Sequence, residues 1–321
     1  MKKRICTLCL VLALLLGLSA AAQAEAGRYP LTITTYNYAK EPVEYTFDKA
    51  PEKVVTLWTN SVENMLALGL GDKIVLAAGV NKEEILPEYQ QELAKVKEIA
   101  PKCPPKEDIV ALQPDLIVGW YSTYGAEKYW GDVDFWHERG CGTLMGLNSS
   151  VLPTQNLQNE YEDILTLGRI FDVEERARQI VDEMQAKVEA GRAYAQGKQP
   201  VRMLILENEG DAFRNYGENC IGGSIATEVG AELCEKDKSK RLSAEDLVGM
   251  NPEIIFAVHF GDEEGKKACV ADFMENPAFA SLDAVKNGKV YPIDLSLIYC
   301  PGVRVNQSID FFLNHLYPDM Q

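Results

Sequence analysis

Two stretches of this sequence are near copies of each other: residues 107–120 read EDIVALQPDLIVGW and residues 245–258 read EDLVGMNPEIIFAV. Five of the 14 aligned positions are identical. In each copy a charged helix start leads to a proline that ends the helix, and then to an apolar run with the pattern of a buried strand. Because each half of the chain holds one copy, we interpret the repeat as the mark of two similar lobes. The alternative is a pair of similar helix–strand units within one large sheet.

Short apolar runs alternate with helical segments on both sides of the repeat. The expected strands are 54–58, 74–78, 116–120, 203–206, 254–258 and 290–293, preceded by a hairpin over 31–47. Continuous apolar strands separated by helices are typical of parallel sheets that helices cover on both faces. The sequence therefore predicts an α/β fold with two lobes, each built on a doubly wound and mostly parallel sheet.

A long amphipathic helix is expected over residues 172–197, between the two halves. Asp172 has the side chain of an N-cap and Glu175 stands at the capping-box position. Apolar residues recur behind them at spacings of three and four. We interpret this segment as a single helix connecting an N-terminal lobe (25–171) to a C-terminal lobe (198–321), although an ordinary covering helix has the same pattern.

The first 24 residues have the features of a secretory signal peptide. Lys2, Lys3 and Arg4 precede an apolar run, and Ala22 and Ala24 are the small residues that signal peptidase requires. The run is shorter than the roughly 20 residues of a membrane-spanning helix. We therefore expect cleavage after residue 24 and a periplasmic or otherwise extracytoplasmic protein, with no membrane insertion.

Charge excludes several classes of partner. The net charge is −16 at pH 7, and loss of the three basic residues of the signal peptide would bring it near −19. A chain this acidic is unsuited to binding nucleic acid or anionic membrane surfaces.

An even number of cysteines follows the signal peptide, which in an exported chain permits disulfides. The simplest pairing in the first half is Cys103 with Cys141. The connectivity of the other four stays open: Cys220, Cys234, Cys269 and Cys300.

Signatures of enzymes are missing from the sequence. There is no GxSxG, HExxH or P-loop motif, and the three histidines, His137, His259 and His315, are widely separated. We therefore expect neither catalytic residues, nor a protein metal site, nor a cofactor. An exported enzyme on the same fold is the rival hypothesis, and a binder of a bare metal ion or oxyanion is another.

Aromatic and basic residues stand where ligands bind in open parallel sheets, beyond the carboxyl ends of the strands. The candidate ligand-binding residues are Trp58, Trp120, Tyr121, Tyr124, Arg214, Tyr216, His259, Phe260, Tyr299 and Arg304. The aromatic rings could stack on planar or apolar parts of a ligand. Arg304, and with it Arg214, could pair with acidic oxygens.

Three segments resemble the class III periplasmic binding proteins that deliver ferric siderophores, haem or cobalamin to ABC importers: APEKVVTL (50–57), the block at 107–120, and GKVYPID…PGVRVNQSIDFFLNHLYPD (288–319). The resemblance implies two lobes joined by one long helix, with a shallow cleft between them. It also implies a monomer that captures a metal chelate reversibly and passes it to a permease dimer with its ATPase. The ligand would contain iron or another chelated metal.

By the same resemblance, Glu107 and Glu245 correspond to paired glutamates that contact the two permease subunits. The plain alternative is that both only stabilise helix N-termini. The ligand itself stays open between a siderophore complex, a corrinoid and haem. Haem would require Tyr121, Tyr216 or His259 as an axial ligand.

Overall fold

The computed structural model describes residues 28–125, 130–261 and 263–320. The expected signal peptide therefore lies outside the described residues. Within them, no helix combines the length and the apolar character that crossing a membrane requires.

The N-terminal half begins with a hairpin and continues as a parallel sheet. Strands β1 (Leu31–Tyr36) and β2 (Pro42–Phe47) pair antiparallel, as predicted. The sheet has the order β5-β4-β3-β6-β7, with every neighbouring pair parallel. Its strands are β3 (Val54–Leu57), β4 (Ile74–Ala78), β5 (Ile99–Ala100), β6 (Leu116–Gly119) and β7 (Gly142–Met145). The α-helices of this half are α2 (Thr59–Ala67), α3 (Gln90–Leu93), α4 (Lys106–Leu112) and α5 (Val133–His137).

The C-terminal half contains a second, mixed sheet of order β11-β9-β8-β12-β13, with β10 also pairing with β8. Strand β8 pairs parallel with β10 and with β12, and β12 pairs parallel with β13. At one edge β9 pairs antiparallel with β8, and β11 pairs antiparallel with β9. The strands are β8 (Arg202–Asn208), β9 (Phe213–Asn215), β10 (Glu232–Leu233), β11 (Arg241–Leu242), β12 (Ile254–His259) and β13 (Val290–Asp294). The α-helices are α8 (Ile221–Glu228), α9 (Ala244–Met250), α10 (Glu263–Met274), α11 (Asp283–Lys286) and α12 (Val305–Leu316).

The sequence repeat is also a structural repeat. Helix α4 leads into β6 and helix α9 leads into β12, and each helix ends at a residue in the left-handed conformation, Gln113 (φ 51°) or Asn251 (φ 44°). The acidic residue after each proline then accepts backbone hydrogen bonds at the start of the neighbouring strand. Asp115 accepts from Lys53 at 3.0 Å, and Glu253 accepts from Arg202 at 2.9 Å. The same unit therefore builds both lobes.

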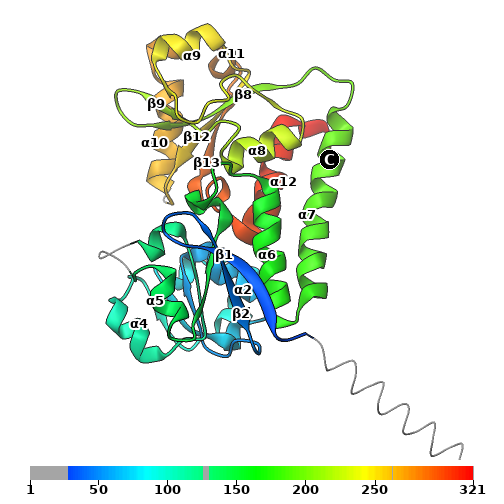
Figure 1. The fold of residues 1–321 in the computed structure, drawn as a ribbon. Helices are drawn as coiled ribbons and strands as arrows, with labels where there is room; N and C mark the ends of the chain where they lie inside the picture. The colour runs from blue at the N-terminus through cyan, green and yellow to red at the C-terminus, as the bar shows by residue number, and fades with distance from the viewer. Residues whose placement is uncertain (1–27, 126–129, 262, 321) are drawn as a thin grey trace, which may run out of the picture.

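One long helix, α7 (Glu174–Ala195), runs alongside both lobes (Figure 1). Its 22 residues span about 33 Å at 1.5 Å per residue. Near its start Arg176 donates to the carbonyl of Ala67 in the N-terminal lobe, and near its end Arg192 pairs with Glu228 in the C-terminal lobe. The fold class, with two lobes joined by a single long helix, is confirmed; the lobe boundaries at 171/172 and 197/198 stay a prediction.

The predicted start of α7 was wrong. Asp172 does not cap α7; it has φ 60° and closes the preceding helix α6 (Leu157–Phe171), which the sequence analysis did not foresee. The residue at the start of α7 is Val173, which offers no capping side chain. Aspartate tolerates the left-handed conformation better than most residues, so here it forms the tight turn between two packed helices.

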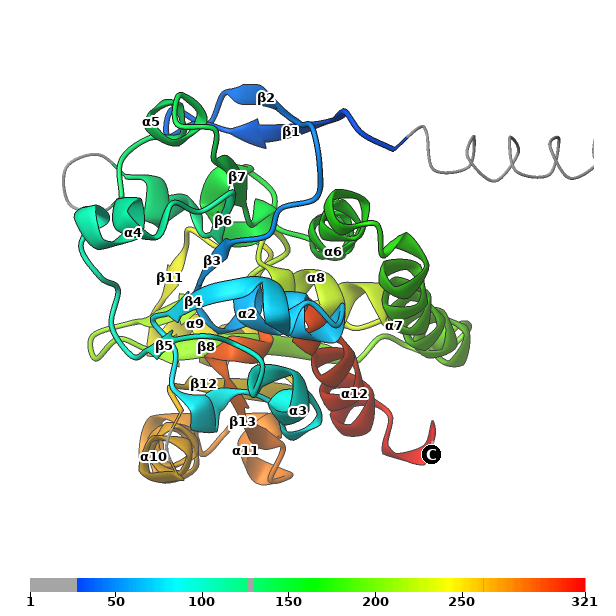
Figure 2. The same cartoon turned by 90° about the horizontal axis from the view of Figure 1, so that it is seen from below.

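A single hydrophobic core passes through both lobes. The inner faces of the two sheets contribute Val54 and Met203, α7 contributes Met184, and α12 contributes Phe312, all at most 1% exposed. A smaller cluster lies on the outer side of each sheet. Figure 2, seen from below, shows α7, α8 and α12 grouped beside the sheets. Because the lobes share their main core, they cannot separate without exposing it.

The expected pairing of Cys103 with Cys141 was wrong. All six cysteines of the described residues are free thiols. The Cys103 thiol points to the carbonyl of Pro104 at 3.8 Å, and the Cys141 thiol to that of Gly142 at 3.4 Å. The two sulfur atoms are thus directed at different backbone groups.

The shared core predicts that Met184→Ala, in the middle of α7, will destabilise both lobes together. Removing this fully buried side chain should cost about 2–5 kcal/mol while preserving one unfolding transition. Differential scanning calorimetry measures both properties. Gln185→Ala, at the next and exposed position of α7, is the control and should unfold like the wild type. Two separate transitions in the Met184 variant would contradict a common core.

Candidate functional site

A pocket of about 460 Å³ lies at the carboxyl ends of strands from both sheets. This is where open parallel sheets bind ligands. The N-terminal lobe contributes residues that follow β3, β4 and β6, and the C-terminal lobe contributes residues that follow β12 and β13. The lining residues are Trp58, Thr59, Asn60, Gly79, Glu84, Trp120, Phe260, Leu295, Ser296, Tyr299, Cys300, Pro301 and Arg304.

Trp58 occupies the pocket at the expense of backbone strain. Its φ is 70° and its ψ 155°, a region that non-glycine residues adopt at a cost of about 1–3 kcal/mol. The indole packs against Gly79, where an added Cβ would lie 2.9 Å from Trp58 Cε3. Gly79 thus leaves the space that the ring occupies. Strain of this kind, when retained, is typical of functional sites.

Trp120 is fixed by a hydrogen bond and by two neighbouring rings. Its indole nitrogen donates to Asn60 Oδ1 at 2.8 Å. Its ring centroid lies 5.4 Å from that of Trp58 and 5.4 Å from that of Tyr299. Phe260, which is 60% exposed, adds a fourth ring from the C-terminal lobe. We call Trp58, Trp120, Phe260 and Tyr299 the aromatic wall.

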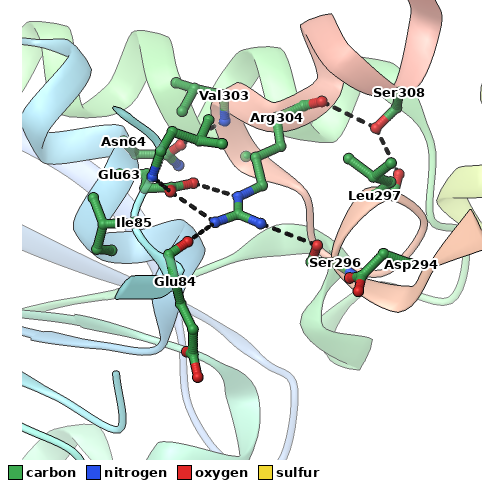
Figure 3. Close-up of polar contacts among 12 residues, drawn as sticks. Glu63, Asn64, Glu84, Ile85, Asp294, Ser296, Leu297, Val303, Arg304 and Ser308 are labelled. Carbon is green, nitrogen blue, oxygen red and sulfur yellow. Dashed lines mark hydrogen bonds and ion pairs between the residues drawn. The ribbon is translucent and has the colours of Figure 1, made fainter. Parts of the chain in front are cut away.

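The guanidinium of Arg304 forms a bidentate ion pair with Glu63 (Figure 3). Its Nε donates to Glu63 Oε2 at 2.6 Å and its Nη2 to Oε1 at 2.8 Å. The Glu63 side chain is fully buried and that of Arg304 is 12% exposed. Arg304 also donates to Ser296 Oγ at 3.1 Å and to the carbonyl of Glu84 at 2.5 Å. The structure therefore gives Arg304 a different role from the predicted contact with ligand oxygens: it joins the two lobes.

The loop before Arg304 is attached to the N-terminal half by further hydrogen bonds. The amide of Val303 donates to Asn64 Oδ1 at 2.9 Å, and that of Gly302 donates to Glu160 Oε2 at 2.8 Å. Gly302 has φ 57°, and an added Cβ would lie 2.4 Å from Asn64 Oδ1. Only glycine fits this approach, which fixes the pocket residues Cys300 and Pro301 between the lobes.

Glu160, on α6 behind the pocket, is a buried carboxyl group. It accepts hydrogen bonds from Asn148 Nδ2 at 2.8 Å and from Gly302. Burial raises its pKa to about 7, and these two hydrogen bonds limit the rise. The neighbouring carboxyl of Asp163 also has a pKa raised by burial and by the charge of Glu160. Because Glu160 accepts a hydrogen bond from the amide of Gly302, its protonation state is linked to the loop that lines the pocket.

Two of the predicted tyrosines lie outside the pocket lining. The ring of Tyr121 stacks on Tyr38 at 4.8 Å, and its hydroxyl donates to the carbonyl of Tyr38. Tyr124 is completely buried and donates to the carbonyl of Ile117 at 2.8 Å. It belongs to the core of its own lobe, which corrects its prediction as a ligand contact.

Three other predicted residues are not among the pocket lining. Arg214 lies 3.5 Å from Glu207, and the hydroxyl of Tyr216 donates to the same carboxylate at 2.6 Å. His259 is 8% exposed, with Nδ1 4.0 Å from Asp294. These side chains contact other residues of the C-terminal lobe. Five other candidates line the pocket, and their contact with a ligand stays a prediction: Trp58, Trp120, Phe260, Tyr299 and Arg304.

Sequence reasoning missed several residues of the site. Gly79 directly follows the predicted strand 74–78, so the rule that selected strand ends could have found it. Leu295 directly follows β13, which ends one residue later than predicted. Glu63 carried a different signal, because it is an acidic residue on α2 beside the apolar residues Val62 and Met65. A carboxylate at such a position needs a buried cation, which the sequence alone does not identify. Among the described residues, no group of three or more His, Cys, Asp and Glu side chains could hold a metal ion.

Comparison with known proteins assigns the family. The family model described as "Periplasmic binding protein" matches residues 54–297. The chain belongs to this family. The resemblance seen in the sequence is thereby confirmed, and the two-lobed architecture with a pocket between the lobes agrees with it.

One relative is a periplasmic binding protein from Veillonella parvula DSM 2008, which is 30% identical in sequence. Its crystal structure superposes with a TM-score of 0.85 and covers 92% of this chain and 93% of that chain. The uncharacterized ABC transporter substrate-binding lipoprotein YvrC of Bacillus subtilis is 24% identical over 281 residues, 86% of this chain and 83% of the relative. The ferric-anguibactin-binding protein FatB of Vibrio anguillarum is 24% identical over 275 residues, 79% of this chain and 78% of the relative.

The raised pKa of Glu160 predicts a specific dependence of stability on pH. From pH 4.5 to about 7 the folded protein retains a proton that the unfolded chain releases, so this group's contribution to the free energy of unfolding falls as pH rises. Glu160→Gln cannot titrate and should lose this dependence. The wild-type free energy of unfolding, minus that of the variant, should therefore fall by about 1–3 kcal/mol between pH 4.5 and 7.5. Urea unfolding at each pH measures it. Glu175→Gln, an exposed change of the same kind on α7, should keep the wild-type slope.

Proposed function

We propose that this protein captures a metal chelate, in the first place a ferric siderophore, outside the cytoplasm and delivers it to the permease dimer of an ABC importer. The observation that carries this proposal is the aromatic wall at the carboxyl ends of strands from both lobes. Flat rings lining an open pocket between two lobes suit the reversible binding of a bulky ligand with planar or apolar parts. The pocket volume of about 460 Å³ lies within the range of small-molecule sites.

The family supports this proposal. Relatives are named as binding proteins for petrobactin, ferric anguibactin and vitamin B12, and another is named as a protein of a high-affinity haem uptake system. The ligand class of this chain is therefore proposed from its own pocket. The axial ligands considered for haem do not favour it, because the hydroxyls of Tyr121 and Tyr216 are engaged in hydrogen bonds and His259 does not line the pocket.

Reversible binding also suits the pocket better than covalent chemistry. The thiol among the pocket residues belongs to Cys300, which is buried, and burial raises its pKa well above the usual value. The thiolate that a nucleophile requires is therefore disfavoured. The hydroxyl of Ser296 accepts a hydrogen bond from the guanidinium of Arg304 at 3.1 Å, so its oxygen is oriented towards a cation rather than activated as a nucleophile. These contacts support a binding protein over an exported enzyme.

For docking, we propose that Glu107 and Glu245 contact one permease subunit each. Both are exposed, in the first turns of α4 and α9. Each has an exposed valine three residues later, Val110 at 36% and Val248 at 41%, so the same charged and apolar pair stands on one face of each helix. Figure 1 and Figure 2 place α4 and α9 on different lobes, both on the side away from α7. A two-lobed protein meeting two like subunits needs one such contact per lobe.

Titration with ferric siderophores tests the proposed ligand class. Because two of the four tryptophans lie in the aromatic wall, binding should quench tryptophan fluorescence, and the absorbance of the complex identifies what is bound. Trp120→Ala and Tyr299→Ala should each weaken binding by about 1–3 kcal/mol. Tyr121→Ala, next to Trp120 but stacked on Tyr38 outside the pocket, is the matched control and should bind normally. Unchanged affinity in both pocket variants would remove the aromatic wall from the ligand site.

Charge reversal tests the docking proposal. Glu107→Arg combined with Glu245→Arg should leave ligand affinity intact but abolish uptake in a reconstituted importer, with an intermediate, salt-sensitive loss for each single change. Glu175→Arg with Asp182→Arg on α7 changes the net charge equally, at exposed positions away from both helices, and should transport normally. If both glutamates only stabilised helix N-termini, the double variant of Glu107 and Glu245 would lose about 0.3–1 kcal/mol of stability per site. It would then transport at the wild-type rate.

A further inference from the structure

Within the described residues, two charged side chains line the pocket between the lobes, those of Glu84 and Arg304. The charge of Arg304 is already compensated by the buried carboxylate of Glu63. We infer that this pocket selects metal chelates that are neutral or positively charged, and holds them by aromatic faces rather than by a basic side chain. The inference rests on the proposed function and names the charge class of its ligand.

The contacts of Arg304 carry the first step. A guanidinium has five N–H donors, and four of those of Arg304 are used by Glu63, Glu84 and Ser296. An anionic ligand could form a bidentate ion pair with the guanidinium only by displacing Glu63. That carboxylate is fully buried and would lose its counter-ion, which is strongly unfavourable. Arg304 therefore is not available as a bidentate anchor for an anion, and its positive charge is already compensated.

The uncompensated charge at the pocket is negative. The Glu84 side chain is exposed and extends away from the guanidinium, while its backbone carbonyl accepts from Arg304 (Figure 3). Its carboxylate accepts a hydrogen bond from the neutral side chain of Asn81 at 2.6 Å. Of the two charged residues that line the pocket, Glu84 is thus the one whose side chain forms no ion pair in the part of the chain that the structure describes.

Arg214 does not change this balance. It is not among the lining residues, and it lies 3.5 Å from Glu207 and 3.9 Å from Glu209. Glu209 also pairs with Arg241, so these side chains compensate one another. The positive charges of Arg214 and Arg241 are therefore balanced by the two glutamates, and this group adds no net positive charge near the pocket.

The aromatic wall favours positive charge. Indole and phenol rings are electron-rich on their faces and attract cations, most strongly for tryptophan. Trp58 and Trp120 lie 5.4 Å apart with their planes 32° from each other, and Tyr299 meets Trp120 nearly edge-on. The strained backbone of Trp58 shows that this arrangement is maintained against a local cost. The net charge of −16 acts in the same direction, because it disfavours the approach of anionic complexes.

A charge series on one ligand scaffold tests the inference. The probes are linear ferric trihydroxamates whose terminal amine is free (cationic), acetylated (neutral) or succinylated (anionic), so that the metal centre is the same in all three. Fluorescence titration at low and physiological ionic strength should give the tightest binding for the cationic probe. We expect the cationic and anionic forms to differ in Kd on the order of 3- to 30-fold, and less at high salt.

Glu84→Gln should narrow the difference between the cationic and anionic probes while leaving the neutral probe unchanged. Glu83→Gln, at the preceding exposed position of the same short helix (Lys82–Glu84), is the matched control and should retain the full difference. Both changes are on the surface, so folding is not at risk.

Two outcomes would overturn the inference in distinguishable ways. Equal or tighter binding of the anionic probe would show that a basic side chain does anchor the ligand, while leaving the proposed function intact. If none of the three probes bound, and haem and a corrinoid also failed to bind, the proposed function would be wrong and this inference with it.

Discussion

The ion pair between Glu63 and Arg304 joins residues that are 241 positions apart, and much of the pocket depends on it. Glu63 is fully buried on α2, where an unpaired carboxylate would not be tolerated. Arg304 compensates it, and in doing so fixes the loop that carries Tyr299 and Cys300 against the N-terminal lobe. Removing either partner would leave an isolated buried charge, which typically destabilises a protein by about 3–5 kcal/mol. The pair therefore sets both the relative position of the lobes and the electrostatic character of the pocket between them.

Rigidity is the second consequence of this arrangement. The main hydrophobic core includes residues from both sheets and from α7, so the lobes do not move as independent bodies. Glycines at 79 and 302 allow the close approaches that Trp58 and Asn64 make. A preformed pocket with fixed rings loses little conformational entropy on binding, which favours affinity without a large closure.

The acidic pair behind the pocket adds a dependence on pH to this rigid frame. Glu160 holds the amide of Gly302, and its raised pKa follows from the burial that the shared core imposes. Glu160 therefore has two effects. Its carboxyl group attaches the pocket loop to α6, and the loss of its proton lowers the free energy of unfolding. Both effects follow from the burial of Glu160 beneath the pocket.

The sequence by itself determined the two-lobed organisation and the longer elements that build it. The repeat at 107–120 and 245–258 indicated two like lobes, the apolar runs located most of the long strands, and the helix between the halves was found within a few residues. These features depend on local periodicity and on glycine and proline, which act over a few positions. The sequence did not predict strands β5, β7, β9, β10 and β11, because two to four residues are too few to show a period.

Only the tertiary structure decided which candidates share a site. Trp58, Trp120, Phe260, Tyr299 and Arg304 meet in one pocket, whereas Tyr124 packs in a core and Tyr216 contacts Glu207. It also revealed Glu63 as the partner of Arg304, because the partner of a buried charge depends on proximity in space and not on position along the chain. A strand end can be predicted from the pattern of its own residues. Which side chains face one another across two lobes depends on how the shared core packs, and no local stretch of sequence contains that information.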